Sequence, residues 1–250
     1  TSIGGDNNSG LMISGFMNVT GNMASGLHFS GIANITGQSF GGLMTSGLLN
    51  VVGEHMNGLQ IAGIANITAS KLNGMQIALC NYATQARGLQ IGLVNYYKED
   101  MKGFQLGLVN ANPDTRVQMM VYGGNATPAN IGVRFKNQLF YTILGVGSMY
   151  QGLNDKFSAS ASYRAGLSFP LYKGLSISGD LGYQHIEAFD NKDEVIPKRL
   201  YALQARANLE YQFTRKFGIF ATGGYGLTRF YNKSSNYDKG AIIEAGIVLF

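Results

Sequence analysis

The stretches GLQIAGIANIT (residues 58–68), GMQIALCNYA (74–83), GLQIGLVNYY (88–97) and GFQLGLVNAN (103–112) are copies of one motif. Each begins with a glycine and a large apolar residue and reaches an asparagine seven or eight residues later. In 88–97 two sets of residues alternate with period two, which predicts an extended strand of about the length that a tilted transmembrane strand needs. Such self-similarity indicates a repeat architecture, so it governs the interpretation of the first half of the chain.

The repeat covers nearly half of the chain, with glycine–apolar pairs spaced by 16, 16, 16, 16, 14 and 15 residues. The pairs are Gly10-Leu11, Gly26-Leu27, Gly42-Leu43, Gly58-Leu59, Gly74-Met75, Gly88-Leu89 and Gly103-Phe104. The asparagines that follow them are Asn18, Asn34, Asn50, Asn66, Asn81, Asn95 and Asn110. We interpret 117–122 as an eighth, degenerate copy. Residues 1–8 align with the back half of a copy, so we expect native sequence upstream of Thr1.

Composition points to one lipid-facing domain. The 250 residues contain no linker, which predicts a single domain over 1–250 with a repeat half (1–122) and a non-repeat half (123–250). Residues 1–97 carry only four charged side chains, a low number for a soluble surface but not for one that faces lipid. No cluster of lysine or arginine forms a stripe, which argues against a nucleic-acid partner.

The second half alternates apolar and polar residues more cleanly. We predict strands at about 130–136, 139–150, 157–170, 174–188, 199–213, 216–231 and 240–250. Short turns near residues 137, 173 and 215 alternate with longer polar loops at 151–157, 189–199 and 231–240. This is typical of the periplasmic turns and extracellular loops of outer-membrane barrels, so we expect 189–199 and 231–240 outside the cell.

Strand counting predicts the closed architecture. Seven strands here and eight in the repeats make fifteen, and bacterial barrels have even numbers. A strand supplied by the repeat at Thr1 completes an all-β, antiparallel transmembrane barrel of about 16 strands, with 14 as the alternative. The strand of Phe250 would then pair with one at or upstream of Thr1. A stacked row of asparagines is also a signature of β-solenoids, so a solenoid followed by a small barrel remains open.

The repeated motif resembles the surface repeats of membrane proteins from Bacteroidota and Leptospira, over about residues 9–112. The resemblance implies a Gram-negative outer-membrane location and a β-barrel fold. It implies no activity and transfers no site residues. The second half resembles Bacteroidota outer-membrane barrels in its pattern alone.

The best candidates for function are charged residues on the inward side of the predicted strands. They are Arg134, Arg164, Asp180, Arg206, Glu210 and Glu244. They would either pair in a rigid, salt-bridged interior or line a pore and set its ion preference. The main hypothesis is a porin-like passive channel. The alternative is a structural or accessory subunit of a larger outer-membrane complex, and a more distant one is an outer-membrane lipid-modifying enzyme.

Motifs for catalysis and metal binding are weak. The G-x-S-x-G match at 37–41 lies in a repeat turn with no helix to follow it, as a nucleophile elbow requires. His28, His55 and His185 lack metal-ligand spacing, and His185 has no serine beside it on the outer face. We therefore predict no enzyme activity, cofactor or metal site. The expected partners are outer-membrane lipid, lipopolysaccharide and other outer-membrane proteins.

Overall fold

A computed structural model describes residues 1–150, 153, 157–189, 199–231 and 236–249. Within these residues, no helix is long and apolar enough to cross a membrane. The chain divides into two compact units, Thr1–Asp114 and Thr115–Phe250, rather than forming the single domain expected. The boundary follows residue 114, so 117–122 belongs with the second unit and not with the repeats.

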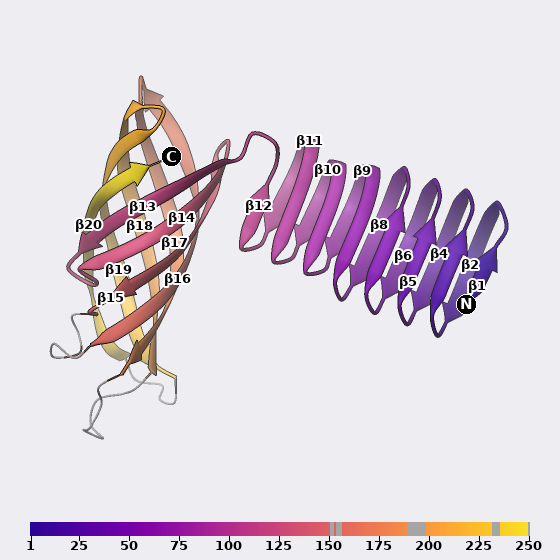
Figure 1. Cartoon of the computed structure of the whole chain (residues 1–250), viewed down its shortest axis with the longest axis horizontal. Coiled ribbons are helices and arrows are strands. Elements are labelled where there is room, and N and C mark those ends of the chain that lie inside the picture. Colours follow the sequence, from indigo (N-terminus) through magenta and orange to yellow (C-terminus); the bar gives the residue numbers. More distant parts are fainter. Residues whose placement is uncertain (151–152, 154–156, 190–198, 232–235, 250) are drawn as a thin grey trace. The chain divides into compact units, whose positions relative to one another are not determined.

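The first unit is a parallel β-solenoid, in which each strand pairs with its counterpart in the next coil (Figure 1). The strands form two parallel ladders, β1-β3-β5-β7 and β2-β4-β6-β8. β9 joins the ladders because it pairs with both β7 and β8, and β10 and β11 continue both ladders. The strands are β1 (Ser2–Gly4), β2 (Asn7–Ser14), β3 (Met17–Thr20), β4 (Met23–Ser30), β5 (Ala33–Thr36), β6 (Ser39–Ser46), β7 (Leu49–Val52), β8 (His55–Ala62), β9 (Ala65–Ile77), β10 (Cys80–Ile91), β11 (Val94–Leu106) and β12 (Val109–Ala111).

The recurring glycine is explained by the close approach of successive coils. Gly58 stacks on Gly42, with which it is paired in register, and has a φ of 133°. A Cβ atom added to Gly58 would lie 2.1 Å from the carbonyl oxygen of Gly42. Only glycine combines this backbone conformation with so little space, so the motif keeps glycine in every coil.

The interior of the solenoid is filled by rows of identical or similar side chains. The seven asparagines form one row, in which each Nδ2 donates to the Oδ1 of the next at 2.8–3.1 Å. Gln60, Gln76, Gln90 and Gln105 form a second row with amide bonds of 2.8–2.9 Å. Phe40, Met56, Leu72 and their neighbours form an apolar row. Buried amides are tolerated here because each one bonds to its counterpart in the next coil.

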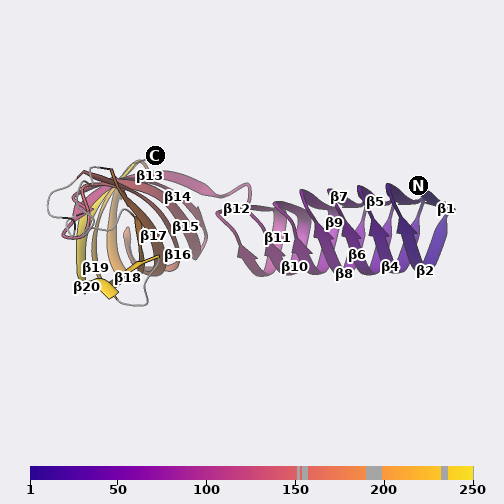
Figure 2. The same ribbon diagram turned by 90° about the horizontal axis from the view of Figure 1, so that it is seen from below.

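The second unit is a closed antiparallel barrel (Figure 2). The strands are β13 (Arg116–Gly124), β14 (Ala129–Asn137), β15 (Phe140–Ser148), β16 (Ser158–Tyr172), β17 (Leu175–Ala188), β18 (Arg199–Thr214), β19 (Phe217–Phe230) and β20 (Asn236–Leu249). Eight strands close this barrel in the described part of the chain, so the predictions of 16 and 14 strands are wrong. The repeats pair with one another and leave none of their strands for the barrel.

Closure occurs between β20 and β13, which pair in antiparallel fashion from Met119↔Leu249 to Gly124↔Glu244. The predicted pairing of the last strand with a strand near Thr1 is therefore wrong. The strands predicted for the second half agree with β14 to β20, because their period-two pattern and turns are local signals. Of the loops predicted outside the cell, 190–198 and 232–235 lie outside the described residues.

We expect Asn50→Ala to destabilise the solenoid by about 2 kcal/mol, because it leaves buried amide and carbonyl groups without partners. Asn50 is fully buried, and its Nδ2 donates to the carbonyl oxygen of Ile61 and to Asn66 Oδ1. Hydrogen exchange measured by mass spectrometry would report faster opening of β5, β7 and β9. Asn57→Ala, at an exposed position, is the matched control and should change exchange little. Equal protection in both variants would contradict the role of the row.

Candidate functional site

All six charged residues singled out in the sequence lie in the interior of the barrel and are at most 8% exposed. They come from strands β14, β16, β17, β18 and β20, on the even-numbered side of each strand. Three are arginines and three are carboxylates, so their formal charges cancel. Whether they contact water or one another is decided by the width of the barrel.

One ion pair spans the barrel. Arg134 on β14 and Glu210 on β18 lie four strands apart on either path around an eight-stranded barrel, on opposite walls. Their guanidinium and carboxylate groups nevertheless meet in a bidentate contact of 2.6 and 3.0 Å. The Nε of Arg134 also donates to Gln118 Oε1 at 2.7 Å. This pair therefore crosses the lumen and occupies it.

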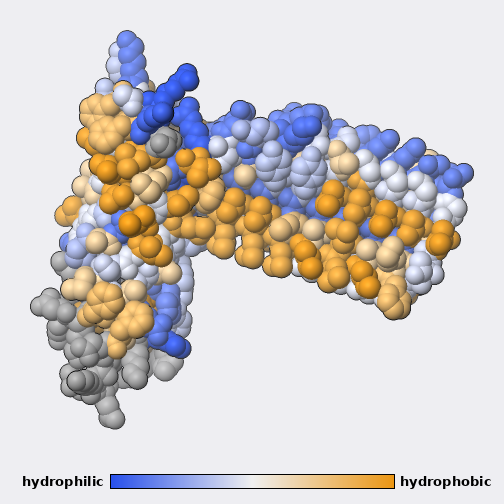
Figure 3. Space-filling view, in the orientation of Figure 1, coloured by the Kyte–Doolittle hydropathy of each residue, from blue (hydrophilic) through white to orange (hydrophobic). Residues whose placement is uncertain are grey.

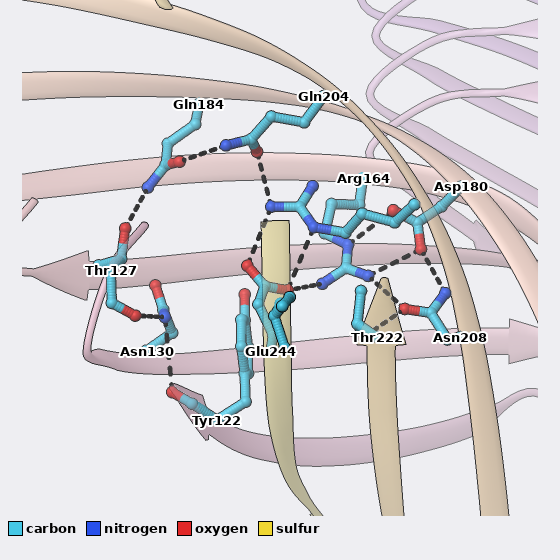
Figure 4. A network of polar contacts seen from close by, with 12 residues as sticks. Tyr122, Thr127, Asn130, Arg164, Asp180, Gln184, Gln204, Asn208, Thr222 and Glu244 are labelled. Atoms are coloured by element: carbon cyan, nitrogen blue, oxygen red, sulfur yellow. Dashed lines mark hydrogen bonds and ion pairs between the residues drawn. The ribbon is translucent and has the colours of Figure 1, made fainter. Parts of the chain in front are cut away.

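The other four charges form one connected network (Figure 4). Arg164 donates to both carboxylate oxygens of Asp180, at 2.8 and 2.7 Å. Arg206 makes two bonds with Glu244, at 3.1 and 3.2 Å. Arg164 Nη1 lies 3.6 Å from Glu244 Oε2 and so joins the two pairs. Because β16 and β20 are also four strands apart, this link is a second crossing of the lumen.

Neutral polar residues add further hydrogen bonds to the network, although Nη1 of Arg164 and Nη1 of Arg206 have no hydrogen-bond partner among the described residues. Asn208 Nδ2 and the hydroxyl of Tyr141 both donate to Asp180 Oδ2, at 2.8 Å each. Thr222 donates to Asn208 Oδ1 at 2.7 Å, and Arg206 Nη2 donates to Gln204 Oε1 at 2.7 Å. The sequence predicted roles for the charged inward residues and not for these neutral ones. Their signal was nonetheless present, because each lies on the inward parity of its strand.

Apolar clusters fill the interior on both sides of the network. The cluster nearer the short turns contains Met120, Tyr122, Tyr141, Ile143, Phe220 and Val248. The cluster nearer the longer loops contains Tyr150, Leu153, Ile186, Ala188, Leu200 and Ala202. The cavity between Arg134, Arg164 and Phe220 measures about 10 Å³, the space of a single water molecule at most. A larger hollow of about 200 Å³ lies at the loop end, beside Tyr150 and Asp238.

The outer surface of the barrel is apolar. Exposed aliphatic residues such as Val133, Leu181 and Ile243 occupy the odd-numbered positions, opposite the buried polar set. Aromatic side chains gather near both ends. Tyr211, Phe213 and Phe217 are in ring contact near the short turns, and Tyr183, Tyr201 and Tyr231 near the longer loops.

The residues of the weaker motifs remain apart. Ser39 of the G-x-S-x-G match lies in β6 of the solenoid, and His28 is buried beside Phe40. Only His185 has polar partners on the outer face: Nδ1 lies 2.7 Å from the Tyr231 hydroxyl and Nε2 lies 3.8 Å from Glu187. Among the described residues, no group of three histidines, cysteines or carboxylates is placed to hold a metal ion.

No protein-family model and no curated protein matches the chain. Among the solved structures that resemble part of it are two β-barrel proteins. One is the N-terminal β-barrel domain of Pseudomonas aeruginosa OprF, with 17% identity, a TM-score of 0.35 and coverage of 53% of this chain and 93% of that one. The other is Neisserial surface protein A, with 9% identity, a TM-score of 0.34 and coverage of 53% and 92%.

Replacing Arg164 by alanine should destabilise the barrel by about 3–5 kcal/mol, because Asp180 would keep a buried charge without its partner. The measurement is the temperature at which the folded electrophoretic form is lost in detergent. Arg199→Ala is the control within the same barrel, since Arg199 pairs with Glu187 on the exposed outer face. An exposed pair contributes at most about 1 kcal/mol. Equal losses in the two variants would show that the interior network is not stabilising.

The solenoid should lose stability in acid through His28. Burial lowers the pKa of His28 below its ordinary value of 6.5, so the unfolded chain binds a proton at pH values where the folded chain does not. The stability of the solenoid is therefore undiminished by His28 above about pH 6.5. It decreases as the pH falls below that value, because proton binding then favours the unfolded chain. Hydrogen exchange of β4 and β6 between pH 7.5 and 5.5, corrected for intrinsic rates, measures this. His28→Met, which matches Met12 and Met44 in the same row, should remove the extra acid sensitivity; an unchanged profile would contradict the assignment.

Proposed function

We propose that this chain is an integral protein of the bacterial outer membrane, in which a sealed eight-stranded barrel anchors the β-solenoid. Its role is that of a structural or accessory subunit in a larger outer-membrane assembly. The observation that carries this proposal is the pair of ionic contacts that cross the lumen, Arg134–Glu210 and Arg164–Glu244. A barrel that only anchors the solenoid in the membrane needs a rigid wall and no water-filled channel.

The interior argues against a passive channel of the kind first expected. An eight-stranded barrel has an interior just wide enough for side chains to fill, whereas porins of 16 to 18 strands enclose water. Here arginine–carboxylate pairs occupy the middle, with apolar clusters on either side. The porin-like channel thus loses the wide lumen on which it depended. A porin-like channel remains a testable second function, because a planar-bilayer recording distinguishes a channel from a sealed anchor.

The outer surface supports membrane insertion. A lipid-spanning barrel carries apolar side chains outward, polar ones inward and aromatic girdles at both interfaces. All three features occur here, with Leu181 and Ile243 outward, Arg164 and Glu244 inward, and rings near both ends. In the proposed orientation the two-residue turns face the periplasm and the longer loops face the exterior.

The proposal names lipid and lipopolysaccharide as the neighbours of the barrel and other outer-membrane proteins as partners of the chain. It includes no nucleic acid, cofactor or catalytic step. His185 contacts a tyrosine hydroxyl instead of a serine. Desolvation and the hydrogen bond shared with Tyr183 raise the pKa of Tyr231 to about 12. Its hydroxyl therefore stays protonated at neutral pH, and a protonated tyrosine is a poor nucleophile.

Planar-bilayer recording tests the sealed anchor. The wild type should produce no stable conductance, because ion pairs and apolar clusters of the described residues occupy the interior of this narrow barrel. Gel mobility with and without heating would establish that the recorded protein is folded, and fractionation of the source cells would establish its membrane. A folded wild type with stable, ion-selective conductance would replace the anchor by the channel. Recovery in the soluble fraction would remove the membrane placement.

A further inference from the structure

One long edge of the solenoid exposes a row of large apolar side chains from six successive coils. The row consists of Phe16, Ile32, Leu48, Ile64, Leu79 and Leu93, which are 37–63% exposed. We call this row the apolar edge. Each residue sits in the two-residue turn that leads from one ladder to the other, as Leu48 does between β6 and β7. Figure 3 shows the apolar surface along this side of the solenoid and polar surface along the opposite side.

The surfaces that flank the apolar edge are also uncharged. On β6 the outward residue Leu43 precedes the edge, and on β7 the outward residues Leu49 and Val51 follow it. The charged residues of these coils lie elsewhere: Glu54 and Lys71 occupy the opposite corner, which carries polar residues in successive coils. The solenoid is therefore amphipathic across its section. Coils stacked about 4.8 Å apart extend the apolar edge to about 25 Å.

Several backbone amides of the apolar edge bond to the preceding coil. The amide of Leu48 donates to the carbonyl of Ile32 at 3.0 Å, and the amide of Ile64 donates to that of Leu48 at 3.0 Å. The amide of Leu93 donates to the carbonyl of Leu79 at 2.9 Å. Turns usually expose backbone groups that must be hydrated, which keeps them out of hydrocarbon. The bonds between the turns at Ile32, Leu48 and Ile64 lower the cost of moving this backbone out of water.

A short covalent link joins the last coil of the solenoid to the first strand of the barrel. β12 ends at Ala111 and β13 begins at Arg116, so these two residues lie within about 20 Å of each other. β13 begins at the end of the barrel that carries the two-residue turns 138–139, 173–174 and 215–216. That end faces the periplasm in the proposed function, on which this inference rests. The lipid leaflet within reach is then the periplasmic leaflet of the outer membrane.

The shape of the apolar edge favours lipid over a protein partner as the material that covers it. The apolar edge is a line of turns between consecutive strands, so its surface is convex. Two such ridges, from two copies of the chain, would touch only along a narrow line. A fluid lipid layer can close around a ridge, as it does around the apolar face of an amphipathic helix at a membrane interface. We propose that the apolar edge inserts into the periplasmic leaflet, which leaves the polar corner of the solenoid free for protein partners.

Cys80 provides a native probe, because it is the chain's single cysteine, is exposed and follows Leu79 of the apolar edge. The full chain, with a polarity-sensitive dye on Cys80, is reconstituted in vesicles of phosphatidylethanolamine and phosphatidylglycerol. Lipids with spin labels on their acyl chains should quench this dye several-fold more than a dye at Glu54→Cys in a Cys80→Ala background. Aqueous iodide should show the opposite order. Leu79→Asp with Leu93→Asp, both at exposed positions, should abolish the quenching by lipid.

Three results would overturn the insertion. If iodide quenches the Cys80 dye as strongly as the Glu54 dye, the edge lies in water. If neither quencher reaches Cys80, a protein such as a second copy covers the edge. If the double aspartate variant is quenched by lipid as the parent is, apolarity does not drive the contact. Heat-dependent gel mobility of the same samples reports folding of the barrel, so these failures are distinct from loss of the anchor, which would remove both proposals.

Discussion

Burying an amide or a guanidinium group without a hydrogen-bond partner costs several kcal/mol, and both units of this chain bury such groups in quantity. The solenoid meets the requirement by translation: each buried asparagine finds its partner in the equivalent residue of the next coil. The barrel meets it by closure, which brings Arg134 to Glu210 across the interior. In both units, the polar side chains specify which backbone segments must be neighbours.

This difference explains what the sequence could predict. In β16 to β19 the period-two pattern and the short turns are local, and antiparallel neighbours in a hairpin follow directly from them. In the repeats the local pattern also reads as strand and turn, but it does not specify the partner of each strand. An extended segment such as 58–68 can pair with its neighbour in a hairpin or with the equivalent segment of the next coil. Strand counting assumed hairpins and therefore enlarged the barrel.

Two residue types carried the missing information. Asparagine at the same place in every copy suits parallel stacking, because an amide both donates to and accepts from an identical amide above and below it. Glycine at the same place removes the side chain where carbonyl oxygens of successive coils approach, as Gly42 and Gly58 show. The row of asparagines in the sequence indicates the solenoid as an alternative to a large barrel. The recurring glycine indicates the same close stacking of coils. At 117–122 the alternation belonged to β13, and its weak likeness to the repeats obscured this strand of the barrel.

The same dependence on partners governs the candidate site. Inward parity could be predicted for Arg164, Asp180 and Glu244, because it follows from counting along a strand. Their chemical role could not, because it depends on the distance across the barrel. Around a lumen of 16 strands the groups on opposite walls would be separated by water and would bias the passage of ions. With eight strands Arg164 lies 3.6 Å from Glu244 on the opposite wall. Strand number is a property of the whole fold. It thus decides whether the same charged residues line a pore or pair with one another across the interior.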